Sequence, residues 1–307
     1  MNEELEKEIP RILGTYTSGK KGPLLFVSGG IHGNEPSGVK ALLKVFKELE
    51  QAKPEIKGTI VGVSGNKVAL NQNKRYIDED LNRAWTEENI QDHKTKTHEQ
   101  KEMWEIIEVL EKYPEADFTK RYFLDCHTTS AASAPYISVQ VKNDNDAWAH
   151  RFPTYIIRGF SDLVYGCIDH YLTRIGVTGF VFEAGQHTAK ESVENHEGMI
   201  WLALKEACDL KLEGIPSYPE CVTRFSEKNA PDQKTFEIRH RHGLANDDHF
   251  KMQPGYENFQ KIEKGELLAI QNDEEIKSEW NARIFMPLYQ AQGNDGFFVV
   301  EEVETAY

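Results

Sequence analysis

The sequence contains no long apolar run, which excludes the classes of protein that need one. No hydrophobic segment approaches the roughly 18 uninterrupted residues of a transmembrane helix, so we expect no membrane partner. The N-terminal segment MNEELEKEIPRIL is acidic and lacks the basic and then apolar layout of a signal peptide. These absences favour a cytoplasmic protein.

Cysteine and positive charge are also scarce. The 307 residues include four cysteines and no CxxC pair, so we expect reduced thiols rather than a disulfide framework. Lysine and arginine number 36 against 50 acidic residues, and the formal net charge of −14 excludes a nucleic acid as the main partner. A small anionic substrate is still compatible with this charge, because a few converging arginines can form a locally positive pocket.

Short apolar runs alternate with helical periodicity along the first two thirds of the chain. Apolar runs that end near turn residues predict strands at 23–28, 58–64, 121–126, 136–141 and 179–183. Apolar residues at three- and four-residue steps predict a helix that begins at Pro36 and further helices over 99–113 and roughly 189–212. This alternation predicts an α/β sheet with helices on both faces.

The pattern changes after Pro216, where Gly, Asn and Asp turns separate short strand-like segments and no long helix is predicted. The segments are 235–241, 267–271, 283–288 and 296–303. We therefore predict two domains, a large one over residues 1–215 and a small β-rich one over residues 216–307.

A histidine and a glutamate lie three residues apart at the first strand-to-helix junction. In the segment GGIHGNEPSG, His32 and Glu35 can point to one side of a single turn and chelate one divalent cation. His127 ends the later run RYFLDCH and is the candidate third ligand, because catalytic zinc typically takes three protein ligands and keeps a position for water. An HxxE pair also occurs by chance, and the glycines could serve only a tight turn. A phosphate-binding loop is disfavoured because no Gly-Lys-Ser/Thr follows.

Two further features could complete a catalytic site. Glu183 closes the apolar run GFVFE, where burying a carboxylate is costly unless it has a partner or a purpose. Over an open metal position it could accept and return a proton, whereas the structural alternative is a glutamate that caps a helix. The segment RYIDEDLNR holds Arg75 and Arg83, which suit bidentate recognition of a carboxylate, although many such segments are only solvated surface loops.

The motifs GGIHGNE, RYIDEDLNR, DCHTTS and FEAG, in this order and spacing, resemble the aspartoacylase and succinylglutamate desuccinylase family. The resemblance runs from about Leu24 to Leu212 and is weak after Pro216. It implies an α/β fold of the zinc carboxypeptidase type, with a mixed twisted sheet flanked by helices. A small C-terminal β-rich domain would partly cover the site, and one zinc ion would be bound per chain.

The resemblance also implies a role for individual residues. His32, Glu35 and His127 match the family's zinc ligands, and Glu183 matches its general base and acid. The arginine that polarises the scissile carbonyl corresponds to Arg75. The substrate-binding positions correspond to Asn82, Arg83 and Arg174, the last with Tyr171 nearby. Phe297 stands where aspartoacylases carry a substrate-contacting tyrosine, so one hydrogen bond to the substrate would be missing.

The implied activity is hydrolysis of the amide bond of a small anionic N-acyl amino acid, such as N-succinyl- or N-acetyl-glutamate or -aspartate. A metallocarboxypeptidase for short peptides would use the same ligands, and a non-catalytic zinc-binding protein is the third alternative. The sequence leaves open the acyl group, the amino acid, the native metal, an ester in place of an amide, and assembly as a homo-oligomer.

Overall fold

The computed structural model describes residues 9–215, 220–229, 233–245 and 247–304. The acidic segment before Ile9 lies outside the described residues. Residues 216–219, at the predicted domain boundary, also lie outside them, so the division into two domains stays a prediction. Among the described helices, none has both the length and the apolar character that a membrane crossing requires.

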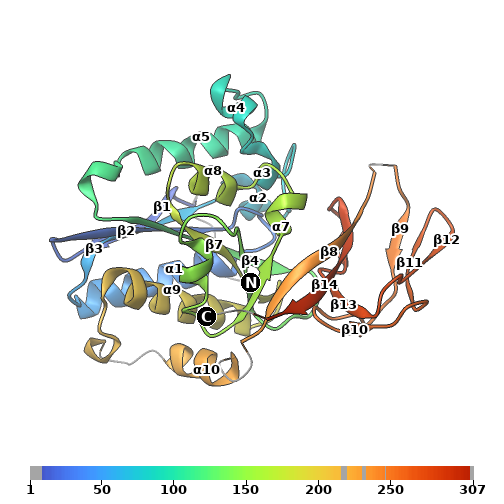
Figure 1. The fold of residues 1–307 in the computed structure, drawn as a ribbon. Coiled ribbons are helices and arrows are strands. Elements are labelled where there is room, and N and C mark those ends of the chain that lie inside the picture. The colour runs from blue at the N-terminus through green and yellow to red at the C-terminus, as the bar shows by residue number, and fades with distance from the viewer. Residues whose placement is uncertain (1–8, 216–219, 230–232, 246, 305–307) are drawn as a thin grey trace.

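One mixed sheet of 11 strands runs through the protein (Figure 1). Neighbours along β3, β2, β4 and β7 are parallel, whereas β1 at one side and β5 at the other pair antiparallel to this block. This arrangement confirms the expected mixed sheet. Across the sheet the strands are β1 (Ile12–Thr17), β3 (Lys57–Ser64), β2 (Lys20–Gly29), β4 (Arg121–Thr129), β7 (Thr178–Gln186), β5 (Tyr136–Val139), β6 (Tyr155–Arg158), β8 (Thr235–Gly243), β14 (Asp295–Val303), β13 (Ala282–Phe285) and β10 (Lys261–Ile262).

Helices cover both faces of the sheet because its central strands are apolar on both sides. Along β2, Leu25 and Val27 enter one hydrophobic cluster, and Leu24 and Phe26 enter the other. This is the two-residue alternation of a strand. In Figure 1 one face is covered by α1 (Ser37–Ala52), α9 (Glu191–Cys208) and α10 (Glu220–Asn229), and the other by α3 (Leu81–Ala84), α5 (His98–Glu111) and α8 (Ile168–Arg174). The shorter helices are α2 (Lys67–Gln72), α4 (Glu87–Gln91), α6 (Asn145–Ala149) and α7 (Phe160–Leu163).

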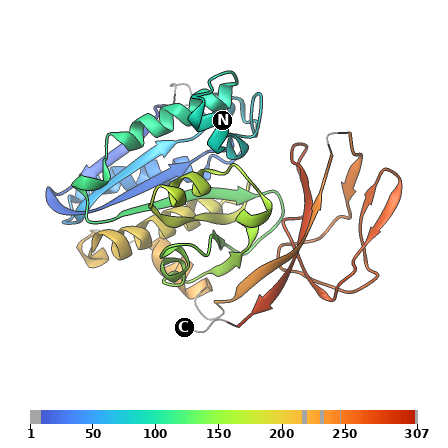
Figure 2. The ribbon, with the colours of Figure 1, turned by 45° about the horizontal axis from the view of Figure 1, so that its top comes forward.

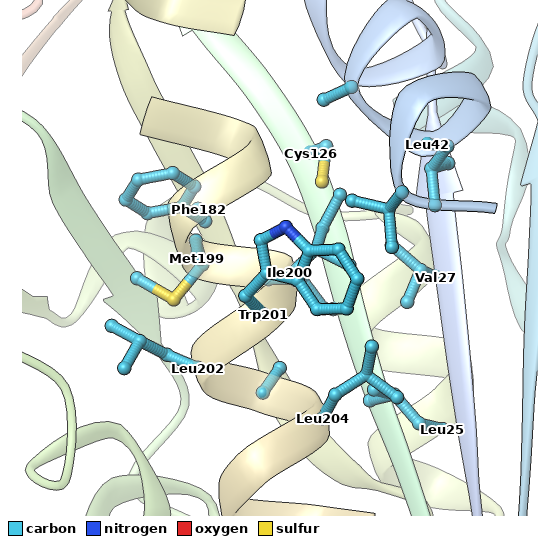
Figure 3. Packing of buried hydrophobic residues seen from close by; sticks show 14 of the residues in the cluster. Leu25, Val27, Leu42, Cys126, Phe182, Met199, Ile200, Trp201, Leu202 and Leu204 are labelled. Atoms are coloured by element: carbon cyan, nitrogen blue, oxygen red, sulfur yellow. The ribbon is translucent and has the colours of Figure 1, made fainter. Parts of the chain in front are cut away.

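The helices α1 and α9 pack on the sheet around Trp201, which is fully buried in the cluster drawn in Figure 3. Truncating a buried aromatic side chain of this kind typically costs about 3–5 kcal/mol of stability. The helix α9 ends at Cys208 rather than near 212, because Asp209 adopts the left-handed conformation with φ 55°.

The sequence analysis missed α10. Its apolar residues Val222 and Phe225 join the same cluster as α9, and the carbonyl of Cys221 lies against Gly198. The sequence predicted no long helix after Pro216, and this helix of ten residues precedes the β-rich part. The helix is short, and most of its residues are polar. Its apolar periodicity is therefore too weak to predict a helix from the sequence.

The C-terminal strands extend the main sheet and add a second, smaller one. Because β8 pairs with β6 of the α/β region, the strands β8, β14, β13 and β10 continue the sheet without a break. A three-stranded sheet of β12 (Glu274–Lys277), β11 (Leu267–Gln271) and β9 (Phe250–Met252) lies beside them, as the orange and red arrows of Figure 2 show. The small β-rich part that the sequence predicted is thus present.

Candidate active site

The predicted site residues meet at the carboxyl ends of the parallel strands. His32 and Glu35 follow β2, and His127 lies near the end of β4, opposite Glu183 of β7 in the parallel register. These residues line a cavity of about 390 Å³. The carboxyl edge of parallel strands is where open α/β sheets usually bind their ligands.

Three of these side chains form a group that could hold a metal ion. One ligand atom each of His32, Glu35 and His127 lies within 4.8 Å of the other two. The Nδ1 atoms of the two histidines face the Glu35 carboxylate, at 2.9 Å for His32 and 3.2 Å for His127. All three side chains are buried.

Both histidines are held from behind by an aspartate. The Nε2 atom of His32 is 3.0 Å from Asp80 Oδ1, and that of His127 is 2.7 Å from Asp125 Oδ2. An Nε2 proton donated to each carboxylate leaves the Nδ1 lone pairs directed at the centre of the group, as metal-binding histidines require. The donor set therefore fits a divalent cation such as zinc.

Sequence reasoning missed both of these aspartates. Asp125 precedes His127 by two residues in a strand, so both side chains lie on one face, and that spacing could have revealed it. Asp80 lies inside the motif RYIDEDLNR and caps α3, where its Oδ1 accepts a hydrogen bond from the backbone of Asn82 at 2.8 Å. The Ser28 hydroxyl adds a 2.7 Å hydrogen bond to Asp125.

The glycine-rich loop fixes the ligands by close backbone packing. A Cβ atom at Gly33 would lie 2.0 Å from the backbone of Ala69, so only glycine fits there. The backbone N–H of Thr128 donates to Glu35 at 2.8 Å. Burial opposes ionisation of Glu35, but the facing histidines outweigh it and hold the pKa of that carboxyl well below its usual value.

Glu183 has the opposite electrostatic character. Burial raises its pKa to about 8, with a further rise from Glu35, although His127 and Arg75 pull in the other direction. Its Oε2 atom has no hydrogen-bond partner in the described part of the chain. A carboxyl that exchanges its proton near neutral pH is suited to acid and base catalysis.

The segment with the two arginines borders the same cavity. The Arg75 guanidinium donates to Asp80 Oδ2 at 2.9 and 3.2 Å, and its Nη1 lies 3.5 Å from Glu35 Oε1. Arg83 pairs with Asp295 at 3.3 Å, and the Asn82 amide lies 3.4 Å from His127 Nε2. The three side chains line the cavity together with the histidines.

A buried carboxylate that the sequence analysis did not single out fixes this segment. Glu99 of α5 is fully buried and accepts hydrogen bonds from the backbone of residues 77, 78 and 79 at 2.7–3.2 Å. The segment is therefore anchored and is not the freely solvated loop that the sequence also allowed.

Two side chains that the sequence analysis discussed lie away from the residues that line the cavity. Arg174 does not line the cavity but pairs with Glu87 at 2.9 Å on the surface, so we do not propose a substrate contact for it. The reason is helical geometry, because Arg174 lies five residues after the cavity-lining Asp169, about 140° around α8. Phe297 is buried and stacks on His242 at a centroid distance of 4.8 Å, also away from the cavity lining.

The fold and the site together define a mixed α/β protein with a buried His–Glu–His group that can hold a metal ion beside a buried glutamate. The comparisons with known proteins identify the family within this class. The chain belongs to the succinylglutamate desuccinylase/aspartoacylase family, because the model of the family's catalytic domain matches residues 21–193. Membership supports a hydrolase of amide bonds, an N-acyl amino acid deacylase.

Several relatives resemble this chain over most of its length. It is 24% identical over 279 residues to a succinylglutamate desuccinylase of Shewanella putrefaciens, covering 84% of this chain and 76% of that protein. A probable aspartoacylase of Nostoc is 28% identical over 167 residues, which are 52% of this chain and 54% of the relative. A crystal structure of succinylglutamate desuccinylase/aspartoacylase from Rhodobacter sphaeroides has a TM-score of 0.67 at 17% identity, and the match covers 93% of this chain and 87% of that one. This structural likeness supports the fold.

Proposed function

We propose that the protein is a zinc-dependent deacylase that hydrolyses the amide bond of an N-acyl amino acid, such as N-acetyl- or N-succinyl-glutamate or -aspartate. The observation that carries the proposal is the buried His32–Glu35–His127 group beside a carboxyl, Glu183, whose pKa is raised to about 8. The family membership and the names of the relatives support it.

The histidines and Glu35 would hold the zinc ion, and Asp80 and Asp125 would keep both imidazoles in the binding tautomer. A zinc ion at this position supplies a Lewis acid that lowers the pKa of water and polarises a carbonyl group. The remaining chemistry belongs to the side chains around it.

Glu183 is the proposed proton carrier of the reaction. Its carboxylate takes a proton from the attacking water and then gives a proton to the leaving nitrogen of the amide. Proton transfer by a positioned side chain is typically worth about 10²- to 10⁴-fold in rate. The unpartnered Oε2 atom leaves the carboxyl available for this exchange.

The arginine segment is the proposed binding element. Arg75 stabilises the negative charge that develops on the carbonyl oxygen, because its guanidinium lines the cavity beside Glu35. Arg83 and Asn82 hold the carboxylate of the amino acid, so that the amide lies between Arg75 and Glu183.

The size and charge of the cavity suit a small anionic substrate. A cavity of about 390 Å³ suits a small molecule, and the C-terminal residues Phe285, Met286 and Leu288 form part of its wall, which disfavours long peptides. Seven acidic side chains line the cavity against two arginines. Against these acidic groups, the two arginines and the proposed zinc ion would supply the positive charge that binds an anionic N-acetyl or N-succinyl amino acid.

A substrate screen of the zinc-loaded protein tests the proposal. We expect hydrolysis of N-acetyl or N-succinyl amino acids and little release of C-terminal residues from short peptides, whereas the reverse preference would identify a carboxypeptidase. The matched variant is Glu183→Gln, which should lose about 10²- to 10⁴-fold in kcat. Its zinc content should equal that of the wild type, and full activity in this variant would refute the assigned role.

A further inference from the structure

Tyr136 carries a buried hydroxyl that the proposed mechanism does not use. The residue lies on β5, is only 1% exposed and belongs to the lining of the cavity. Within the described residues its hydroxyl has no hydrogen-bond partner. Leaving a buried hydroxyl unpaired is energetically unfavourable, so a ligand that enters the cavity could supply the missing partner.

Tyr136 lies on the strand next to that of Glu183, the proposed proton carrier. Tyr136 is directly opposite Glu183 in the antiparallel register of β5 and β7, so both side chains leave the sheet on the same face. Burial, followed by the charges of Glu183 and Glu35, raises the pKa of Tyr136 well above its usual value. The group therefore stays a neutral hydroxyl, which can donate a hydrogen bond to an oxygen atom.

The aromatic ring is held by the C-terminal part of the chain. It makes edge-to-face contacts with Phe259 at a centroid distance of 5.5 Å and with Phe285 at 5.0 Å. These contacts fix the ring. The hydroxyl that the ring carries is therefore held in place before a ligand binds, which lowers the entropic cost of a contact.

The strand order indicates which part of a substrate would meet this hydroxyl. The candidate metal ligands come from β2 and β4, Glu183 from β7, and Tyr136 from β5 at the far side. Glu183 is proposed to protonate the leaving nitrogen. The part of the substrate that lies on the Tyr136 side of Glu183 would then be the amino acid attached to that nitrogen. We propose that the Tyr136 hydroxyl donates a hydrogen bond to an oxygen on the side chain of the leaving amino acid, an inference that rests on the proposed function.

Matched substrates test this contact in the zinc-loaded wild type and in the Tyr136→Phe variant. Each pair consists of N-acetyl amino acids of similar shape with and without a side-chain oxygen, such as asparagine against leucine and glutamine against methionine. We expect kcat/KM of the variant to fall about 10- to 100-fold for the oxygen-bearing member and less than about 3-fold for its apolar partner. The melting temperature should not fall, because the hydroxyl that is removed has no partner among the described side chains.

Other outcomes overturn the inference. An equal loss on both members of each pair would indicate a structural or general catalytic role, and no loss would show that the hydroxyl is not a contact. A loss that follows the acyl group, in an N-succinyl against N-acetyl comparison, would place the contact on the wrong side of the amide. The proposed function fails separately if the wild type hydrolyses neither these compounds nor the N-acetyl and N-succinyl derivatives of glutamate and aspartate. In that case calorimetry measures the binding of free asparagine and free leucine to the wild type and to Tyr136→Phe. If neither amino acid binds, or if asparagine binds both proteins equally well, the inference is overturned.

Discussion

The two parts of the chain that border the cavity contribute in different ways. The edge of the parallel block consists of the loop after β2, the carboxyl ends of β4 and β7, and the Arg75–Arg83 segment. It supplies the proposed metal ligands, the proposed proton carrier and the two arginines. The C-terminal strands supply a wall that is largely apolar, with Phe285, Met286 and Leu288 among its residues.

Three of the polar contacts between the two parts involve residues that line the cavity. The Asn34 amide donates to Gln290 at 3.1 Å, His187 lies 3.2 Å from the same oxygen, and Arg83 pairs with Asp295 at 3.3 Å. From this difference we infer that turnover depends on the sheet edge and that the wall contributes to the choice of substrate. Changes at the sheet edge should abolish turnover, whereas changes in the wall should alter which substrate is used.

Removing Arg75 should produce the largest contrast between the two parts. The Arg75→Ala variant loses a donor to the developing oxyanion, so we expect a loss of about 10²- to 10³-fold in kcat, with Arg75→Lys in between. The matched change in the wall is Arg241→Ala, which removes a partner of Asp295 and should change kcat less than about 3-fold. Steady-state kinetics with the zinc content measured in parallel checks this. Equal losses in the two variants would contradict this contrast.

The loss of folding stability at low pH should also arise in the α/β region. His196 of α9 is fully buried, and burial lowers its pKa to about 3. The unfolded chain takes up this proton below about pH 6.5 and the folded chain does not, so stability is lost as the pH falls from about 6.5 toward 3. The loss should amount to roughly a few kcal/mol.

The His196→Leu variant should therefore lose less stability than the wild type between pH 7 and pH 5. Urea unfolding of the chelator-treated protein at both values measures the difference. Ser278→Ala is a matched control in the C-terminal part, because this buried hydroxyl bonds only to the backbone of Trp280 among the described residues. Parallel pH curves for wild type and His196→Leu would show that the acid sensitivity arises elsewhere.

The sheet edge was predictable from the sequence because its residues sit at strand ends and in compact motifs. His32, Glu35, His127 and Glu183 each follow or close an apolar run, so the strand pattern alone brought them to one edge. Their roles stay predictions until they are tested. Partners such as Asp125 and Glu99 were missed because their function depends on which buried groups they face.

The wall could not be predicted in this way. Phe285, Met286 and Asp295 lie far along the chain from the ligand motifs, and they border the cavity because β8, β14 and β13 extend the sheet beside β6. Arg174 illustrates the same limit, because an error of a fraction of a helical turn moves a side chain from the cavity to the surface. The spacing of residues in the sequence shows which face of a helix a side chain occupies only when the rotation of that helix about its axis is known.

The smallest expected effect concerns the ion pair between Arg83 and Asp295, which joins the binding segment to the C-terminal strands. If Arg83 binds the substrate as proposed, Asp295 would compete with the substrate carboxylate for its guanidinium. In Asp295→Asn the arginine is released from a charged partner, so KM for an N-acetyl amino acid should fall about 2- to 5-fold with kcat unchanged. Glu301→Gln removes an exposed partner of Arg239 away from the cavity and should leave KM unchanged. A rise in KM for Asp295→Asn would show that the pair instead orients Arg83 for binding.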